Sequence, residues 1–299
     1  MTEIIKVIDV TAMKKVYGNY TQEELNSQYN QLVLVPNQSV YAMQNRAKSA
    51  EVRKKLKCML NVSYGPTLDE VLDIFPAGLP GRPIQVYHHG GAWTQSHKDD
   101  YSYIAESFVA KRVNLIIPNF SLAPKVTLDE IVRQNRAVIV WAYHNAGSYG
   151  GDQQRLYICG HSSGGHLAGM MMATDWQKEY GLSGDLIKAA TSISGMYELE
   201  PVRLSHRNEY LFLDERAANR NSPIRNIPGV RIPLVIGYGD GEHDEFKRQS
   251  DEFAVAWKNA GNSVSKIIMA GQNHFDVARE FARVDSPIMK ATWANMSLE

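Results

Sequence analysis

The chain has 299 residues, 44% of them hydrophobic, and its 32 lysines and arginines are balanced by 32 aspartates and glutamates. A neutral chain has no net field to draw it to nucleic acid or to an anionic membrane, so we expect neither as a partner and expect a neutral or mildly polar small-molecule substrate. The length suits one α/β domain over residues 1–299. Only Cys58 and Cys159 are present, far apart in sequence, which argues against a disulfide framework and predicts a cytoplasmic location.

The N-terminal segment, residues 1–60, is predicted to be helical. Its first residues mix Glu3, Lys6 and Asp9 with apolar residues and so lack the continuous core of a secretory signal. Thr21 and Glu24 have the spacing of a capping box, and a second helical pattern runs from residue 39 to about 57. We expect this segment to decorate one edge of the sheet near the site rather than to enter the pocket, and its tyrosines make it a candidate homodimer contact.

Strand and helix patterns alternate over the rest of the chain. Short apolar runs predict strands at 71–75, 84–88, 113–117, 156–159, 189–194, 233–238 and 264–269. Helical spacing predicts helices at 101–112, 128–146, 165–180 and 244–261. The alternation predicts an α/β fold with a mostly parallel sheet and helices on both faces. The first two runs, joined by a Gly and Pro turn, predict an antiparallel hairpin, and the strandless residues 195–229 predict an excursion over the active site.

The pentapeptide Gly160-His161-Ser162-Ser163-Gly164 follows a predicted strand and opens a predicted helix. This context is the nucleophile elbow of the α/β-hydrolase fold, where a tight strand-to-helix turn presents a serine hydroxyl to a base. Ser162 is therefore the candidate nucleophile. Centring the pattern on Ser163 fails, because His161 would then stand at the first glycine position.

The order of catalytic residues in this fold is Ser, then Asp or Glu, then His. Of the histidines after Ser162, His166 lies in the elbow helix, His206 in the excursion and His243 in the loop that carries the candidate acids. His274, just past the last predicted strand, remains as the candidate base. An imidazole with a pKa near 6.5 can take the serine proton and return it to the leaving group.

Four carboxylates compete for the role of triad acid in the loop after the strand at 233–238. Asp244 and Glu245 open the next helix, where the helix dipole accounts for their charge. Asp240 and Glu242 remain, and spacing alone does not choose between them.

The segment His89-Gly90-Gly91-Ala92-Trp93 follows the predicted strand at 84–88 and supplies a candidate oxyanion hole. Paired glycines there let backbone amides converge on the elbow, so the amides of Gly91, Ala92 and Ser163 are the candidate donors. His89, Gly90 and Trp93 are candidate substrate-binding residues.

Two other classes of protein are weaker alternatives. A metal-dependent hydrolase is disfavoured because His88 and His89 point to opposite faces of a strand, while His161 and His166 lack a carboxylate at ligand spacing, so we expect no metal and no cofactor. A non-catalytic binding protein on the same fold is disfavoured because no triad member is missing.

The segment from His89 to Trp93 resembles the His-Gly-Gly-x-Trp motif of kynurenine formamidases, or arylformamidases, which are relatives of the hormone-sensitive-lipase-like esterases. The resemblance continues through the elbow and five other segments: 64–66, 195–201, 221–223, 244–249 and 273–275. It implies an α/β-hydrolase that cleaves a formamide, typically N-formyl-L-kynurenine, through a formyl-enzyme intermediate. Counted back from the Glu245-Phe246 pair, the family's acid position falls on Glu242.

The chain departs from the family pattern at two positions. Ala92 stands where the family often has an aromatic residue, and Ser163 stands where alanine is usual. Because a methyl-sized change in a pocket alters selection by about 1 to 3 kcal/mol, a carboxylesterase or carbamate hydrolase of small aryl substrates is the alternative function.

Overall fold

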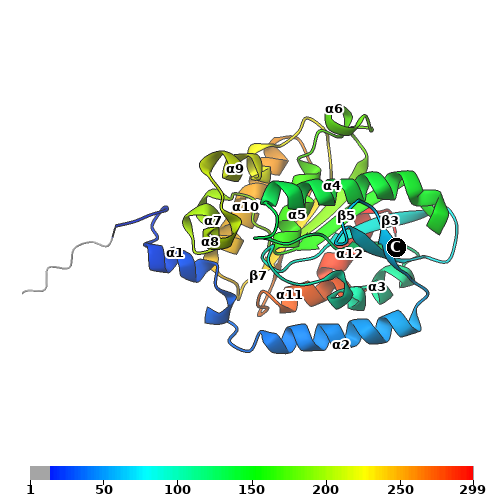
Figure 1. The fold of residues 1–299 in the computed structure, drawn as a ribbon, viewed down its shortest axis with the longest axis horizontal. Coiled ribbons are helices and arrows are strands. Elements are labelled where there is room, and N and C mark those ends of the chain that lie inside the picture. Colours follow the sequence, from blue (N-terminus) through cyan, green and yellow to red (C-terminus); the bar gives the residue numbers. More distant parts are fainter. Residues whose placement is uncertain (1–13, 299) are drawn as a thin grey trace, which may run out of the picture.

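The computed structural model describes residues 14–298, and residues 1–13, the start of the predicted N-terminal segment, lie outside it (Figure 1). One sheet holds strands in the order β1-β2-β4-β3-β5-β6-β7-β8. Their bounds are β1 (Met59–Ser63), β2 (Val71–Phe75), β3 (Arg82–His88), β4 (Asn114–Pro118), β5 (Gly151–His161), β6 (Ile187–Ile193), β7 (Leu234–Gly239) and β8 (Val264–Met269). β2 is antiparallel to β1 and β4, and all other neighbours are parallel. The mostly parallel sheet that the sequence predicts is confirmed.

Helices cover both faces of this sheet. The α-helices are α1 (Gln22–Gln28), α2 (Ser39–Lys55), α3 (Ala105–Ala110), α4 (Leu128–Asn145), α5 (Ser163–Met172), α6 (Trp176–Tyr180), α7 (Glu200–Leu204), α8 (Asn208–Leu211), α9 (Glu215–Arg220), α10 (Asp244–Asn259), α11 (Asp276–Arg279) and α12 (Pro287–Asn295). The 3-10 turns are η1 (Gln31–Val33), η2 (Lys98–Asp100), η3 (Ser102–Ile104), η4 (Ala146–Tyr149), η5 (Pro223–Arg225) and η6 (Glu280–Ala282).

Alternate residues of the central strands pack into two apolar layers. Val86 and Ile158 join the layer formed with α4, α5 and α10, whereas Tyr87 and Cys159 join the layer formed with α3 and α12. Figure 1 shows α4 and α5 on one side of the sheet and α2, α3 and α11 on the other. Burial on both faces explains why these strands read as continuous apolar runs. No helix of the described residues is both long and apolar enough to cross a membrane.

The predicted hairpin of the runs at 71–75 and 84–88 is wrong. β4 lies between the two strands, and the antiparallel partner of β2 on its other side is β1. β1 escapes a search for apolar runs because its sequence, Met-Leu-Asn-Val-Ser, is half polar and much of it is exposed at the sheet edge. Hydrogen bonding between distant segments decides which strands become neighbours, and a short Gly and Pro turn does not.

Two predicted helices are broken in the structure. The pattern at 165–180 divides into α5 and α6, because Asp175 accepts a hydrogen bond from the amide of Lys178 and starts a new helix. The pattern at 101–112 begins with η3 before α3. The capping box predicted from Thr21 and Glu24 is present at the start of α1.

The expectation that the N-terminal segment only decorates a sheet edge is corrected by the structure. The Oγ of Ser49 in α2 accepts a hydrogen bond from the amide of Tyr103 at 3.0 Å, so the helix packs on η3. Gln31 and Tyr41, on either side of the turn into α2, line the cavity that also holds Ser162 and His274. The apolar spacing of the segment predicts its helices but not the surface against which they pack.

Candidate active site

Ser162 lies at a sharp turn between β5 and α5 and has φ 58° and ψ −126°. A left-handed conformation is costly for a residue with a side chain and is found where the surrounding structure enforces it, often at functional sites. Gly164 makes the turn possible, because a Cβ at this position would overlap the carbonyl oxygen of His88 at the end of β3. The elbow thus presents the Ser162 hydroxyl at the carboxyl end of the parallel strands.

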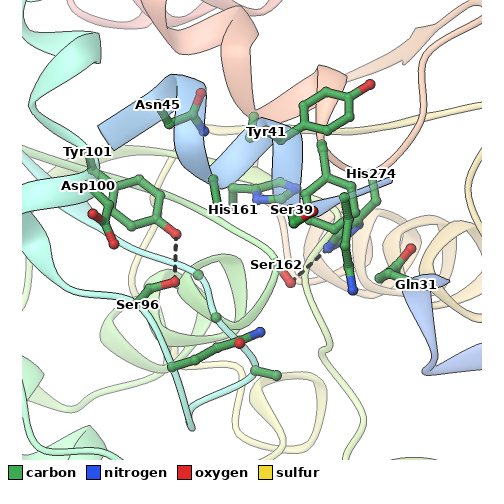
Figure 2. Close-up of a pocket in the computed structure, with 18 of the residues that line it drawn as sticks. Gln31, Ser39, Tyr41, Asn45, Ser96, Asp100, Tyr101, His161, Ser162 and His274 are labelled. Atoms are coloured by element: carbon green, nitrogen blue, oxygen red, sulfur yellow. Dashed lines mark hydrogen bonds between the residues drawn. The ribbon is translucent and has the colours of Figure 1, made fainter. Parts of the chain in front are cut away.

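His274 connects Ser162 to a buried carboxylate. Its Nε2 lies 2.9 Å from Ser162 Oγ (Figure 2), and its Nδ1 lies 2.6 Å from Glu242 Oε2. All three residues are nearly buried, at 6%, 4% and 3% exposure for Ser162, His274 and Glu242. A carboxylate can only accept, so Nδ1 carries the proton and Nε2 is free to accept from the serine hydroxyl.

Glu242, and not Asp240, is the acid that contacts the imidazole. The second oxygen of Glu242 accepts hydrogen bonds from Ser194 Oγ at 2.6 Å and from the amide of Gly239 at 2.7 Å. Asp240 is exposed and accepts from the amide of Gly271 at 2.7 Å, which ties two loops together. The carboxylate beside His274 is therefore held rigidly at both oxygens.

The loop after β3 passes directly over the elbow. A Cβ at Gly90 would lie 2.9 Å from the carbonyl oxygen of His161 and 3.3 Å from Ser162 Cβ, so glycine allows this close approach. Ala92 follows with φ 52°, which turns the backbone sharply. Within residues 14–298 no hydrogen bond from the amides of Gly91, Ala92 or Ser163 is found. These amides are available as donors beside the serine.

Two of the candidate substrate-binding side chains lie behind the cavity wall. Trp93 is buried, and its Nε1 donates to His166 Nδ1 at 3.3 Å. His166 in turn donates from Nε2 to the carbonyl of Asn221 at 2.8 Å. His89 is also buried and its ring stacks on other aromatic rings. Neither Trp93 nor His89 lines the cavity, whereas Gly90 does. Trp93 anchors the Gly90 loop to the elbow helix.

The cavity at Ser162 has a volume of about 720 Å³. Its wall includes residues that were not predicted from the sequence to line the pocket: Gln31, Tyr41, His161, Arg207 and Phe275. His161 stands inside the pentapeptide, and its ring lies 4.5 Å from that of His274. Burial, together with the neighbouring His274, holds the pKa of His161 well below its usual value. A positive charge on His161 is thus disfavoured beside the ring of His274.

Three buried histidines around the elbow make stability depend on pH. Burial lowers the pKa of His88, His89 and His166 from 6.5 to about 4. Between these two pH values the unfolded chain binds more protons than the folded one. The free energy of unfolding is therefore highest above about pH 6.5 and decreases as the pH drops towards 4. Each histidine lowers the free energy of unfolding by up to about 1.4 kcal/mol for each unit by which the pH falls within this range. Urea unfolding at about pH 7, 5.5 and 4.5 measures the slope.

The substitution His89→Phe isolates one of these contributions. The ring of His89 stacks 4.2 Å from Phe120 and 5.4 Å from Tyr101, so a phenyl ring keeps the packing without a titrating nitrogen. We expect a shallower loss of stability below pH 6.5 in this variant than in the wild type. An unchanged slope in His89→Phe would show that His89 does not resist protonation in the folded state.

The described residues hold no cluster of three or more His, Cys, Asp or Glu side chains arranged to bind a metal ion. The arrangement of Ser162, His274 and Glu242 is instead that of a nucleophile, a base and an orienting acid.

Comparison with known proteins agrees with this geometry. A kynurenine formamidase from Danio rerio is 31% identical over 277 residues, which cover 88% of this chain and 92% of the relative. One from Salmo salar is 31% identical over 235 residues, which cover 76% and 78%. The family model BD-FAE matches residues 72–201. A solved structure from Silicibacter, provisionally assigned as a thioesterase, superposes with a TM-score of 0.79 and 25% identity, covering 90% of this chain and 98% of the other.

The chain is a hydrolase of small substrates, as its kynurenine formamidase relatives indicate. Because the identity to the Danio rerio protein extends over nearly the whole of both chains, this protein belongs to the kynurenine formamidase family of α/β-hydrolases.

Proposed function

We propose that the protein is a serine hydrolase that cleaves a small aryl formamide, such as N-formylkynurenine, through an acyl-enzyme intermediate. One observation carries the mechanism: His274 contacts Ser162 Oγ at 2.9 Å with one ring nitrogen and the buried Glu242 at 2.6 Å with the other. The names of the relatives from Danio rerio and Salmo salar support the choice of substrate.

In the first half of the reaction Ser162 Oγ attacks the formyl carbon while its proton passes to His274 Nε2. Glu242 stabilises the imidazolium that forms, and the amides of Gly91, Ala92 and Ser163 bind the oxyanion. The tetrahedral intermediate then collapses, the C–N bond breaks, and His274 returns the proton to the leaving arylamine. Ser162 is left carrying a formyl ester.

In the second half a water molecule attacks the formyl ester, with His274 again taking a proton. The C–O bond to Ser162 breaks, the serine recovers its proton, and formic acid leaves. The buried, unprotonated His161 contributes no charge to this cycle, and Trp93 acts as a positioning residue that holds the Gly90 loop over the elbow through His166.

An ester hydrolase is the second candidate function. The Silicibacter structure, provisionally assigned as a thioesterase, supports ester chemistry on this fold, and the same acyl-enzyme steps apply to an ester or a carbamate. Ala92 and Ser163 flank the serine at the positions where the chain departs from the formamidase motif.

The proposal is tested by kcat/KM on N-formylkynurenine, N-acetylkynurenine, aryl esters and aryl carbamates. We expect kcat/KM for the formyl compound to exceed that for its acetyl analogue by roughly 10- to 200-fold, which is the discrimination that a closely fitting pocket achieves against one additional methyl group. A fluorophosphonate probe should label the wild type and not Ser162→Ala. A higher preference for esters would select the second candidate, and inertness towards every substrate and the probe would point to a binding protein.

A further inference from the structure

Arg207 is a buried cation in the wall of the cavity that holds Ser162. The residue is 4% exposed and comes from the excursion over residues 195–229, immediately before α8. Its Nη2 donates to the carbonyl of Tyr29 at 3.0 Å, and Nη1 lies 3.2 Å from Met196 Sδ. The Nε has no partner. None of these neighbours is an anion, and no ion pair joins Arg207 to a carboxylate of residues 14–298.

The other arginines nearby show how unusual this is. In the same excursion Arg203 pairs with a glutamate in its own helix, and the half-exposed Arg220 and Arg225 pair with carboxylates from other segments. Arg207 is the more deeply buried residue, and burial without a counter-charge lowers the pKa of its guanidinium. An unpaired buried charge is costly, so its place beside a cavity indicates that a ligand supplies the anion.

Gln31 is a second unsatisfied group in the same wall. It is 8% exposed, and neither its side-chain oxygen nor its side-chain nitrogen has a hydrogen-bond partner within the described part of the chain. Figure 2 includes Gln31 among the residues that line the cavity with Ser162 and His274. The carbonyl that binds Arg207 belongs to Tyr29, two residues before Gln31, so both groups depend on the same turn of the N-terminal segment. Buried amides without partners are rare in proteins and indicate a ligand or water.

The remaining charges of the wall are already neutralised. Asp100 pairs with Arg46 at 2.8 Å, and burial keeps His161 unprotonated. The guanidinium of Arg207 lies 5.3 Å from the Tyr29 ring, which packs 6.0 Å from Phe246, and Phe246 packs 4.7 Å from His274. Within residues 14–298 no hydrogen bond or ring contact joins Arg207 directly to Ser162 or His274, so the group that Arg207 binds is not the scissile carbonyl.

We propose that Arg207, assisted by the side-chain amide of Gln31, binds a carboxylate at the far end of the substrate and makes the enzyme selective for acids over neutral compounds. The inference rests on the proposed hydrolase function and adds to it the residues that determine specificity. It differs from the neutral substrate expected from the balanced charge of the chain, because a net charge of zero says nothing about one unpaired buried residue. A guanidinium suits the role, since it donates two parallel hydrogen bonds to a carboxylate.

The test compares kcat/KM for N-formylkynurenine and for its α-carboxamide, in which an uncharged amide replaces the carboxylate while the formamide and the α-amino group are kept. Wild type is expected to prefer the acid by roughly 10- to 100-fold, the range for hydrogen bonds to a charged group. Arg207→Met should remove this preference through a higher KM for the acid, with the carboxamide changed only a few-fold. Gln31→Leu should reduce the preference several-fold, and Arg216→Met, which removes an exposed arginine of the same excursion, should leave it intact.

The outcomes separate the two proposals. Hydrolysis of neither compound defeats the proposed function, whereas hydrolysis of both with equal kcat/KM defeats only the role of Arg207. An equal loss on both compounds in Arg207→Met would show a structural role and overturn the inference. Within residues 14–298 the side chain of Gln31 bonds to no protein group, so Gln31→Leu is expected to fold, and its selectivity decides the matter if Arg207→Met unfolds in a thermal melt.

Discussion

Replacing Ser162 with alanine is expected to lower kcat by roughly 10⁴-fold or more, because the covalent route through the acyl-enzyme disappears. The Oγ of Ser162 bonds only to His274, and alanine keeps the backbone path of the elbow, so the thermal unfolding midpoint should stay near that of the wild type. Formate release from N-formylkynurenine measures the rate, and a thermal melt measures the fold.

Ser96→Ala is the matched control for this experiment. Ser96 lines the same cavity but bonds to the hydroxyl of Tyr101 at 3.3 Å, away from His274 (Figure 2). We expect its loss to change kcat only a few-fold. Comparable activity in Ser162→Ala and wild type would reject Ser162 as the nucleophile.

The substitution Glu242→Gln is expected to lower kcat by roughly 10²- to 10⁴-fold with the protein still folded. The Oε1 of glutamine can keep the hydrogen bonds from Ser194 and Gly239, but its amide would place an N–H opposite the Nδ1–H of His274. Two donors cannot bond, so the imidazole would shift its proton to Nε2 and lose the ability to accept from the serine. Single-turnover kinetics with an activated ester measures the acylation step.

Asp240→Asn is the matched control, since it removes the neighbouring carboxylate from the same loop. Asp240 accepts only the amide of Gly271, and an asparagine oxygen can keep that bond. We expect kcat within a few-fold of wild type. If Asp240→Asn were the more damaging change, the assignment of the acid would have to be reversed.

The chemistry of the site is largely local in sequence, which is why much of it could be predicted. The elbow needs a serine at a turn with glycine at close-packed positions, and Gly164 meets the backbone of β3 as that pattern requires. The position of His274 follows from chain order, because the carboxyl ends of parallel strands gather the loops that follow them. The Gly90 loop was predicted to lie beside the serine for the same reason, because it follows the carboxyl end of the parallel strand β3.

Contacts between distant segments were outside the reach of the sequence. Asp240 and Glu242 are two residues apart and chemically alike, so their spacing does not separate them. The family resemblance favours Glu242, and in the structure this carboxylate turns inward and accepts hydrogen bonds from Ser194 and Gly239. The antiparallel partner of β2 also could not be predicted from the sequence. β1 is an edge strand with two polar residues among five, and it is recognised only by its pairing with β2.

The sequence by itself predicted the fold class and most of the strands, and it predicted the nucleophile and the base, because these depend on local patterns and on one topological rule. The tertiary structure decided the spatial order of the edge strands, which of the two candidate acids contacts His274, and the cavity wall built from the N-terminal segment and the excursion. No sequence pattern distinguishes Gln31 and Arg207. Their proposed role rests on their burial in the cavity wall with side-chain atoms that have no hydrogen-bond partner in the described residues. Burial and unmet hydrogen bonding are properties of the assembled molecule, and no local pattern encodes them.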